Sequence, residues 1–325
     1  MLRFILRRTL GALVILLIIS AVTFFLFFAL PRDPARLACG KICTPANLEL
    51  IRHNLAIDAP VWVQYGKWLV AIVVGRDFTT GHCAAPCLGY SFVNQEPIFQ
   101  TIVDRFPTTV SLTIGAAVVF VVFGVGMGMI AAWKQGTIAD KVASSASLIG
   151  SSMQIYFVGA LATYFLVDQW HLMDRARYVP FTDNPLAWAH GLLLPWCVLA
   201  IIFTANYTRM TRSSMVEQLN EDFVRTARAK GMPERTVFLR FAWRGAMGPI
   251  ITIFGVDLGV LLGGAIITEQ TFTLHGIGEL SIKAVINQDL PMLLAVVMVA
   301  ATAIVILNIV VDAVYAAVDP RVRLT

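Results

Sequence analysis

The sequence predicts an all-α integral membrane protein with six transmembrane helices and a small extracytoplasmic insert between the first and second helices. Of the 325 residues, 58% are hydrophobic and 14% are charged, whereas a soluble domain is typically about 45–50% apolar and about 25% charged. Long uncharged stretches recur along the chain, and the basic residues concentrate in the segments between them. This composition excludes a disordered chain, a disulfide-stabilised mini-protein and a cytosolic enzyme.

Six stretches are long enough to cross a bilayer, which takes roughly 20 mostly apolar residues. They are residues 9–31, 106–133, 142–167, 184–208, 245–268 and 290–311. The first exceeds the apolar region of a secretory signal, about 7–15 residues, and no small-residue cleavage site follows it, so we expect a retained helix.

The basic residues predict the orientation of these spans. If both termini are cytoplasmic, the inside segments hold 15 Lys and Arg in 66 residues, and the outside segments hold 10 in 111. The inside segments are then 1–8, 134–141, 209–244 and 312–325, and the outside segments are 32–105, 168–183 and 269–289. This asymmetry follows the positive-inside rule and predicts a multi-pass protein of the cell membrane with both termini cytoplasmic. The net charge of +5 then indicates contact with membrane lipid, and we expect no nucleic-acid partner.

The outside segment 32–105 carries four of the five cysteines, as Cys39-x3-Cys43 and Cys83-x3-Cys87. Outside the cytoplasm an even set of cysteines is typical of disulfides, either as two local bridges or as a cross-link between the pairs. Structural zinc prefers C-x2-C spacing, so we expect no metal here.

The sequence offers no enzyme chemistry. It has no phosphate-binding loop, no H-E-x-x-H metal motif and no Ser/His/Asp constellation at an informative spacing. Asp257, the one acid well inside a span, and Glu269 are candidates for the translocation path. For Asp257 the alternatives are a hydrogen bond between helices and a proton relay. Cys197, in the fourth span, is predicted to be a buried small apolar residue.

The cytoplasmic segment 209–244 has an ordered layout. Residues 221–230 predict a helix, with Gly231 as its stop, Pro233 beyond it and a second helix over 234–243. Its acids precede its bases, which suits the helix dipole, and Ala227 and Ala229 leave one face slim enough for a groove on a partner. A docking element therefore accounts for this layout better than a basic loop on lipid head groups. The candidate coupling residues are Glu221, Asp222, Arg225, Thr226, Ala227, Arg228, Ala229, Lys230 and Gly231.

This segment resembles the EAA coupling loop in permease (transmembrane) subunits of the oligopeptide/dipeptide/nickel ABC importer family. Other stretches resemble the family in the same order and together span essentially the whole chain. They are Leu30-Pro31-Arg32-Asp33-Pro34-Ala35, then Pro60, Gln64-Tyr65 and Trp68-Leu69, then Arg105-Phe106-Pro107-Thr108-Thr109, then Leu262-Gly263-Gly264-Ala265, Glu269, Phe272 and Gly276-Ile277-Gly278, and finally Asp319-Pro320-Arg321. Each stretch alone is weak, whereas the ordered set with the six-span layout is specific.

Three features depart from the family's pattern. Arg32 stands where the family usually has Gly in Leu-Pro-Gly-Asp-Pro, and Arg225 stands where the general coupling loop has Glu. Peptide-type members commonly differ at the latter position, which leaves coupling intact but changes the contacts with the partner. The four outside cysteines are not part of the pattern.

The resemblance implies the ABC type I importer permease arrangement. Its parts would be a first helix at 1–31, the insert at 32–105, a five-helix core at 106–318 that includes the coupling loop 209–244, and a cytoplasmic tail at 319–325. The chain would pair with a second homologous permease subunit, two cytoplasmic ATPase subunits or domains and an extracytoplasmic peptide-binding protein. It would take up short peptides and hold no cofactor itself, because ATP and Mg would be bound by the ATPases.

Two other classes of function remain as alternatives. The chain alone could be a secondary transporter or channel for small solutes, although no internal repeat supports this. It could also be a membrane-anchored sensor that uses the insert. Within the family, dipeptides, longer peptides, glutathione and nickel chelates are all carried, and the sequence does not choose among them.

Overall fold

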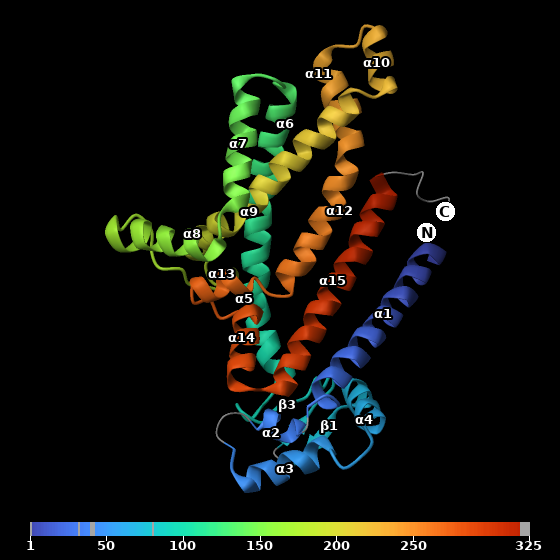
Figure 1. Ribbon diagram of the computed structural model, residues 1–325, viewed down its shortest axis with the longest axis vertical. Helices are drawn as coiled ribbons and strands as arrows, with labels where there is room; N and C mark the ends of the chain where they lie inside the picture. The colour runs from blue at the N-terminus through green and yellow to red at the C-terminus, as the bar shows by residue number, and fades with distance from the viewer. Residues whose placement is uncertain (1, 32, 40–42, 80, 319–325) are drawn as a thin grey trace. The chain divides into compact units, whose positions relative to one another are not determined.

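The computed structural model describes residues 2–31, 33–39, 43–79 and 81–318 (Figure 1), with side chains described from residue 7 to residue 313 within these ranges. Arg32, the Asp319-Pro320-Arg321 stretch and the predicted tail 319–325 lie outside the described residues. The chain divides into two compact units. One comprises Met1–Val110, Gly259–Glu269 and His275–Ile309, and the other comprises Ser111–Leu258, Gln270–Leu274 and Val310–Thr325.

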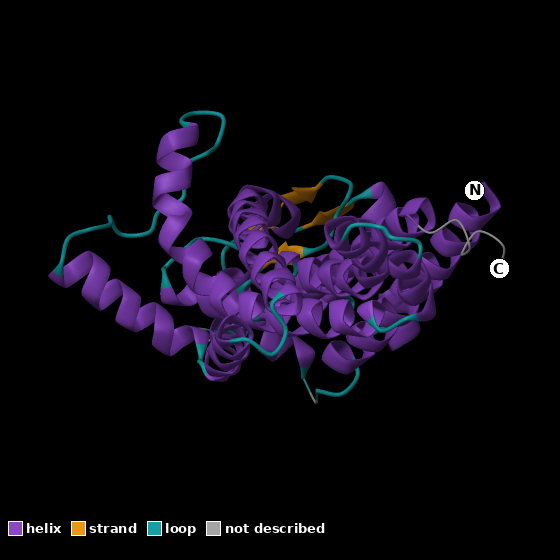
Figure 2. Ribbon diagram, turned by 90° about the horizontal axis from the view of Figure 1, so that it is seen from above, coloured by secondary structure: helices purple, strands orange, loops and turns teal. Residues whose placement is uncertain are grey.

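The first unit begins with the long helix α1 and continues into the small predicted insert. The helices are α1 (Leu2–Phe28), α2 (Pro34–Ala38), α3 (Pro45–Leu55) and α4 (Val61–Val74). Two antiparallel pairs of short strands follow among these helices (Figure 2), β1 (Arg76–Phe78) with β2 (Gly81–Cys83) and β3 (Tyr90–Ser91) with β4 (Glu96–Pro97). Asp33 and Thr44 cap α2 and α3, and a proline occupies the first turn of each helix.

Apolar clusters hold the first unit together. Ile98 and Ile102, at the start of α5 (Ile98–Phe120), pack with residues of α14 (Ile277–Asn287) and α15 (Leu290–Val318). Phe24 and Phe28 of α1 form a second cluster with residues of α15, and their rings stack at 4.5 Å. Neither of these two clusters includes a strand residue, so both are formed by packing between helices and the loops beside them.

The second unit is almost entirely helical. After α5 a π-helical turn, Val121–Val125, leads into α6 (Gly126–Trp133), which with α7 (Ile138–Ser152) packs against α9 (Pro185–Leu219). A Cβ at Gly124 would lie 2.7 Å from the Cβ of Tyr207 on α9, so the glycine allows close helix approach. The remaining elements are α8 (Ile155–Ala162), a π-helical turn Thr163–Gln169, α10 (Asp222–Ala229), α11 (Glu234–Thr236), a π-helical turn Val237–Ala242, α12 (Trp243–Leu262) and α13 (Ile266–Thr271).

By length and composition, five helices within the described residues can cross a membrane, or six if one bent pair is a single span. The bent pair, Ile138–Ser152 with Ile155–Gln169, turns by 97°, so the predicted span 142–167 consists of two helices at a sharp angle. The hydroxyls of Ser151 and Ser152 both donate to the Leu148 carbonyl at 3.0 Å, which offers the backbone an alternative to the helical ladder. The six-span count therefore depends on how this pair is counted.

The fifth predicted span, 245–268, also differs from the structure. Its helix, α12, ends at Leu262, and Gly264 follows with a φ of +128°. A Cβ on Gly264 would lie 2.8 Å from the Cα of Gly278, so the break occurs where two backbones meet closely. Three of the other four predicted spans each correspond to one helix, α1, α9 or α15, and the span 106–133 corresponds to α5, a π-helical turn and α6. The helices begin before the predicted start in α1 and α5 and end beyond the predicted end in α9 and α15.

Candidate functional site

The predicted coupling helix forms as α10. Glu221 occupies the position before the helix in extended conformation, and Lys230 follows its last residue. Gly231 then adopts a φ of 73°, the left-handed conformation that glycine tolerates best. Pro233 precedes α11, which continues through the π-helical turn into α12. We call residues 221–236 the α10 segment; its helix–turn–helix layout agrees with the predicted one.

A small apolar cluster forms the inner side of the α10 segment. Val224, Ala227 and Val237 are buried and pack together with Leu219 and Phe241. Val224 and Ala227 are three residues apart and therefore share one helix face. Ala227, predicted to belong to a face that enters a partner's groove, packs here against the chain itself. Ala229 remains exposed.

The outer side of the α10 segment is charged. The exposed candidate residues are Glu221, Asp222, Arg225, Thr226, Arg228, Ala229, Lys230 and Gly231. Arg228 Nε lies 2.7 Å from Glu234 Oε1, so an ion pair joins α10 to α11 across the turn. Sequence reasoning missed Phe223 and Met232, which are 45% and 38% exposed. The signal was available, since both are large apolar residues within an otherwise polar stretch.

A partly buried ion pair, also missed by sequence reasoning, fixes the turn between α6 and α7. Asp140 is 5% exposed and receives both Nε and Nη2 of Arg212 on α9, the latter at 2.8 Å from Oδ2. The backbone N–H of Gly136 also donates to Asp140 at 2.9 Å. This bidentate pairing ties the turn to the same long helix that leads into the α10 segment.

Asp257, one candidate for the translocation path, makes a hydrogen bond between helices. The hydroxyl of Tyr207 on α9 donates to Asp257 Oδ2 on α12 at 2.9 Å. This is the interhelical contact that the sequence left as an alternative to a path or relay residue.

Glu269, the other path candidate, is fully buried at 0% exposure. The Thr109 hydroxyl donates to its Oε1 at 2.8 Å, and the backbone N–H of Glu279 donates to its Oε2 at 2.9 Å. Thr109 in turn accepts from the backbone N–H of Ile277 at 2.9 Å. The carboxylate thus caps the N-terminus of α14, where the helix dipole favours negative charge. Burial raises the pKa of Glu269, and these hydrogen bonds oppose the rise.

Glu279, in the first turn of α14, is surrounded by three basic side chains near this cap. Its carboxylate lies 2.6 Å from Arg105 Nη1, 2.5 Å from Lys283 Nζ and 3.4 Å from His275 Nδ1. Burial acts to raise the pKa of Glu279, but Lys283 and Arg105 outweigh it and hold the pKa below its ordinary value. Residues 174 positions apart meet here, so no local pattern in the sequence indicates this cluster.

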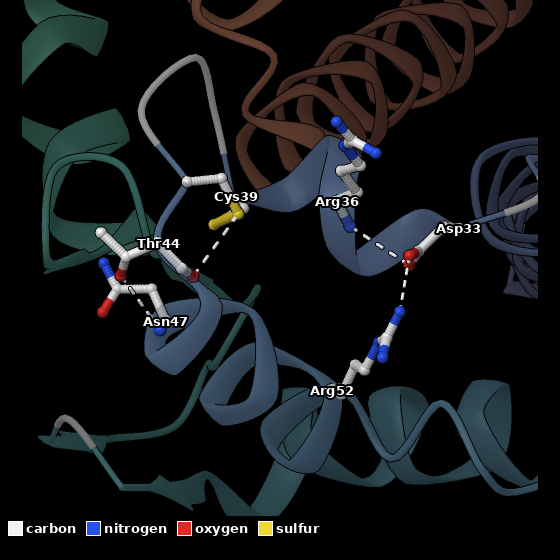
Figure 3. The surroundings of a disulfide bond; sticks show 7 residues. Asp33, Arg36, Cys39, Thr44, Asn47 and Arg52 are labelled. Carbon is white, nitrogen blue, oxygen red and sulfur yellow. Dashed lines mark hydrogen bonds and ion pairs between the residues drawn. A yellow bond between two sulfur atoms is a disulfide. The ribbon is translucent and has the colours of Figure 1, made fainter.

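The four cysteines of residues 32–105 form two local disulfides. Cys39 pairs with Cys43 (Figure 3), and Cys83 pairs with Cys87. Cys83 and Cys87 are each 1% exposed, in a cluster with Ala71. Among the described residues no group of three or more His, Cys, Asp or Glu side chains is placed to hold a metal ion.

An ion pair next to the first disulfide anchors α2 to α3 (Figure 3). Asp33 Oδ2 lies 2.7 Å from Arg52 Nη2, and Asp33 also accepts from the backbone N–H of Arg36 at 3.3 Å. The hydrogen bond with Arg52 holds the pKa of Asp33 below its ordinary value.

The prediction for Cys197 is wrong, because this free cysteine is exposed on α9 rather than buried.

Comparisons with known proteins cover nearly the whole chain. A model described as the N-terminal part of binding-protein-dependent transport system membrane components matches residues 1–113. A second, described as the binding-protein-dependent transport system inner membrane component, matches residues 124–324.

Three curated relatives show the range of the similarity. The chain is 35% identical over 319 residues to a putative peptide transport system permease protein of Brucella abortus, covering 98% of each chain. It is 34% identical over 324 residues to a glutathione transport system permease protein of Salmonella choleraesuis, covering 99% of each. It is 30% identical over 320 residues to a probable peptide ABC transporter permease protein of Sinorhizobium fredii, covering 98% of this chain and 99% of the other.

Proposed function

The chain belongs to the family of inner-membrane components of binding-protein-dependent transport systems, as an ABC permease of the peptide type, and from this premise we propose that it imports short peptides with energy from partner ATPases. In this proposal it pairs with a second, homologous permease subunit. Two cytoplasmic ATPase subunits or domains bind ATP and Mg, and an extracytoplasmic peptide-binding protein delivers the substrate. Relatives named for peptide and for glutathione transport support a short-peptide substrate class.

One observation carries the coupling part of the proposal. The α10 segment presents Asp222, Arg225 and Lys230 outward while Val224 and Ala227 fix its inner side to the chain's own apolar cluster. A short helix fixed in this way can transmit a displacement between a bound partner and the spans on either side, whereas a flexible loop would absorb it. We therefore assign the exposed residues of this segment from Glu221 to Gly231 to ATPase docking.

The proposed orientation places both termini and the α10 segment in the cytoplasm, and the insert with its two disulfides outside. The concentration of Lys and Arg in the inside segments supports this orientation. Two disulfides within the insert fit an oxidising compartment.

The test is co-purification and uptake with the full set of partners. Reversing two exposed charges, Arg225→Glu with Lys230→Glu, should leave membrane insertion unchanged and lower both ATPase retention and ATP-driven peptide uptake at least about tenfold. Lys141→Glu, an exposed base outside the α10 segment, is the matched control and should behave like the wild type. Normal ATPase retention by the double variant would refute the docking assignment.

A second experiment separates this proposal from a self-contained transporter. The chain reconstituted alone in liposomes should not take up peptide under a proton or sodium gradient. Gradient-driven uptake by the chain alone would favour the secondary-transporter alternative, which has its own expected features of inverted repeats and broken helices.

A further inference from the structure

A groove lies between the end of α6 and the segment that starts at α11. It encloses about 430 Å³ and is lined by side chains from only these two parts of the second unit. Its apolar lining includes Ile130, Trp133, Phe238 and Leu239, and its basic lining consists of Lys134 and Arg235. We call this cavity the α6 groove.

The walls of the α6 groove are apolar and open. Ile130, Trp133 and Leu239 are 56%, 47% and 47% exposed, although each is a large side chain that avoids water. The Trp133 ring meets the Phe238 ring edge-on, with centroids 4.7 Å apart. The two rings thus form one side of the groove. The exposed apolar side chains beside them form a patch that an apolar ligand can cover.

The two cations of the groove stand without partners in the described part of the chain. Neither Lys134 nor Arg235 makes a side-chain hydrogen bond or an ion pair there, although both are exposed. By contrast, Arg212 and Arg228 of this unit are paired, with Asp140 and Glu234. The groove therefore offers two free positive charges to an anion.

Both cations stand at the end of a candidate span. Lys134 directly follows Ile98–Trp133, and Arg235 is the second residue of Glu234–Leu262. In the proposed orientation these ends face the cytoplasm, and Trp133 is of the aromatic type that is enriched at membrane–water interfaces. An occupant must combine a hydrocarbon part along the apolar wall with an anionic group at the two cations.

We propose that the α6 groove binds one anionic phospholipid, with its phosphate between Lys134 and Arg235 and an acyl chain along Trp133, Phe238 and Leu239. Basic pockets at the ends of spans on the cytoplasmic side bind such head groups by the same combination of charge and apolar surface. Arg235 lies in the α11 end of the α10 segment, directly after Glu234, which pairs with Arg228; the lipid would therefore contact this end of the segment and not the docking residues from Glu221 to Gly231. The lipid site is independent of the transported substrate and can fail while the proposed transport function stands.

The test measures lipid retention by the full chain purified in detergent, by native mass spectrometry after addition of phosphatidylglycerol or phosphatidylethanolamine. The wild type should retain one phosphatidylglycerol in clear preference to phosphatidylethanolamine. Lys134→Gln and Arg235→Gln should each weaken phosphatidylglycerol retention about fivefold, and the double variant about 25-fold, as expected for the loss of one or two charges near an anionic head group. Equal retention of the two lipids by the wild type would overturn the proposal.

Matched variants distinguish the groove from general surface charge. Lys141→Gln and Arg240→Gln remove exposed bases of the same unit that do not line the groove, and they should retain phosphatidylglycerol like the wild type. A loss in these controls equal to the loss in Lys134→Gln would overturn the groove as the site.

Two further measurements test the hydrocarbon part. Leu239→Trp narrows the groove and keeps both cations, so it should also lower phosphatidylglycerol retention; unchanged retention would overturn the assigned acyl-chain position. Inorganic phosphate at millimolar concentration should not displace the lipid, because it has no apolar part. Full displacement by phosphate would show an anion site without a lipid and refute the proposal.

Discussion

Two short helix–turn–helix segments of this chain show opposite arrangements of charge. In the α10 segment the apolar side chains of Val224 and Ala227 are inside and the charges are outside. In the segment from α13 to α14, residues 266–287, a carboxylate is inside: Glu269 is fully buried and accepts hydrogen bonds from Thr109 and the backbone of α14. Both segments have glycine in the turn, so the turn alone does not decide which side the charges take.

The difference teaches which segment is free to bind a partner. The polar groups around Glu269 satisfy one another within the first unit, and removing one leaves others buried without a partner. The charged side chains of the α10 segment point to solvent, and most of them are free to contact a partner. The fold of the segment depends on a few apolar contacts. The former segment is thus specified by its own network, whereas the latter has side chains left for recognition.

The largest expected effect is at the inner carboxylate. Glu269→Ala removes the acceptor for the Thr109 hydroxyl and for the N–H of Glu279, and leaves a cavity in a fully buried position. We expect a loss of about 4 kcal/mol in the free energy of unfolding, measured by thermal or denaturant unfolding in detergent. A loss below about 1 kcal/mol would show that the network does not specify this segment.

The variant Glu269→Gln tests the same network through the pH dependence of stability. Burial raises the pKa of Glu269, so its contribution to stability is fully present below the ordinary pKa of about 4.3 and is lost as the pH rises through the raised value. Relative to the glutamine variant, the wild type should therefore lose stability as the pH rises above the ordinary pKa of about 4.3. A constant difference between the two unfolding midpoints over this range would contradict the shift.

The next effect concerns the apolar side of the α10 segment. Ala227→Pro removes a helical hydrogen bond and disrupts the packing with Val224 and Val237, a local cost of about 3 kcal/mol. Because the change is confined to the α10 segment, the spans should insert normally while ATP-driven uptake in proteoliposomes falls at least about tenfold. Ala229→Ser, at an exposed position, is the control and should keep uptake; full activity of the proline variant would contradict the role of this helix.

A smaller effect is expected at the turn that closes α10. Gly231 has a φ of 73° and no atom within 4 Å of the site where a Cβ would lie. Gly231→Ala therefore costs only the backbone strain of the left-handed conformation, about 1 kcal/mol. Hydrogen exchange of the amides that follow the turn should report this local destabilisation, with no change in the global unfolding midpoint.

The smallest effect is expected for the exposed ion pair across the same turn. Arg228 and Glu234 are 41% and 60% exposed, so water and salt screen their attraction. A double-mutant cycle with Arg228→Gln and Glu234→Gln should give a coupling energy of about 0.5 kcal/mol. A coupling energy above about 2 kcal/mol would make this exposed pair as strong as contacts in the buried network of Glu269. The contrast between the two segments would then be weaker.

The sequence predicts the α10 segment better than it predicts the segment from α13 to α14. The order of acids, bases, Gly231 and Pro233 sets the ends of α10 locally. The inward direction of Ala227 was missed, because it depends on Val237 beyond the turn. The role of Glu269 depends on Thr109, 160 residues away, which no local pattern contains.

The spans differ in the same way: some follow from the local sequence, and others depend on details that the sequence pattern does not contain. Charge-free length alone identifies α1, α5 with α6, α9 and α15, because crossing hydrocarbon demands it. The bend lies where Met153, directly after Ser152, has an extended backbone, and α12 ends where Gly264 closely approaches Gly278. Both breaks are local geometry within apolar stretches, and hydropathy does not report them.

The two disulfides have a consequence for how the protein is made. Each joins cysteines only four residues apart, so correct pairing needs no contact with distant parts of the chain. On the proposed orientation, these thiols leave the translocation machinery while the later spans are still being synthesised. The insert can therefore be oxidised during biosynthesis, and a recombinant host that lacks thiol oxidation in that compartment would yield an inserted permease with an immature outer surface.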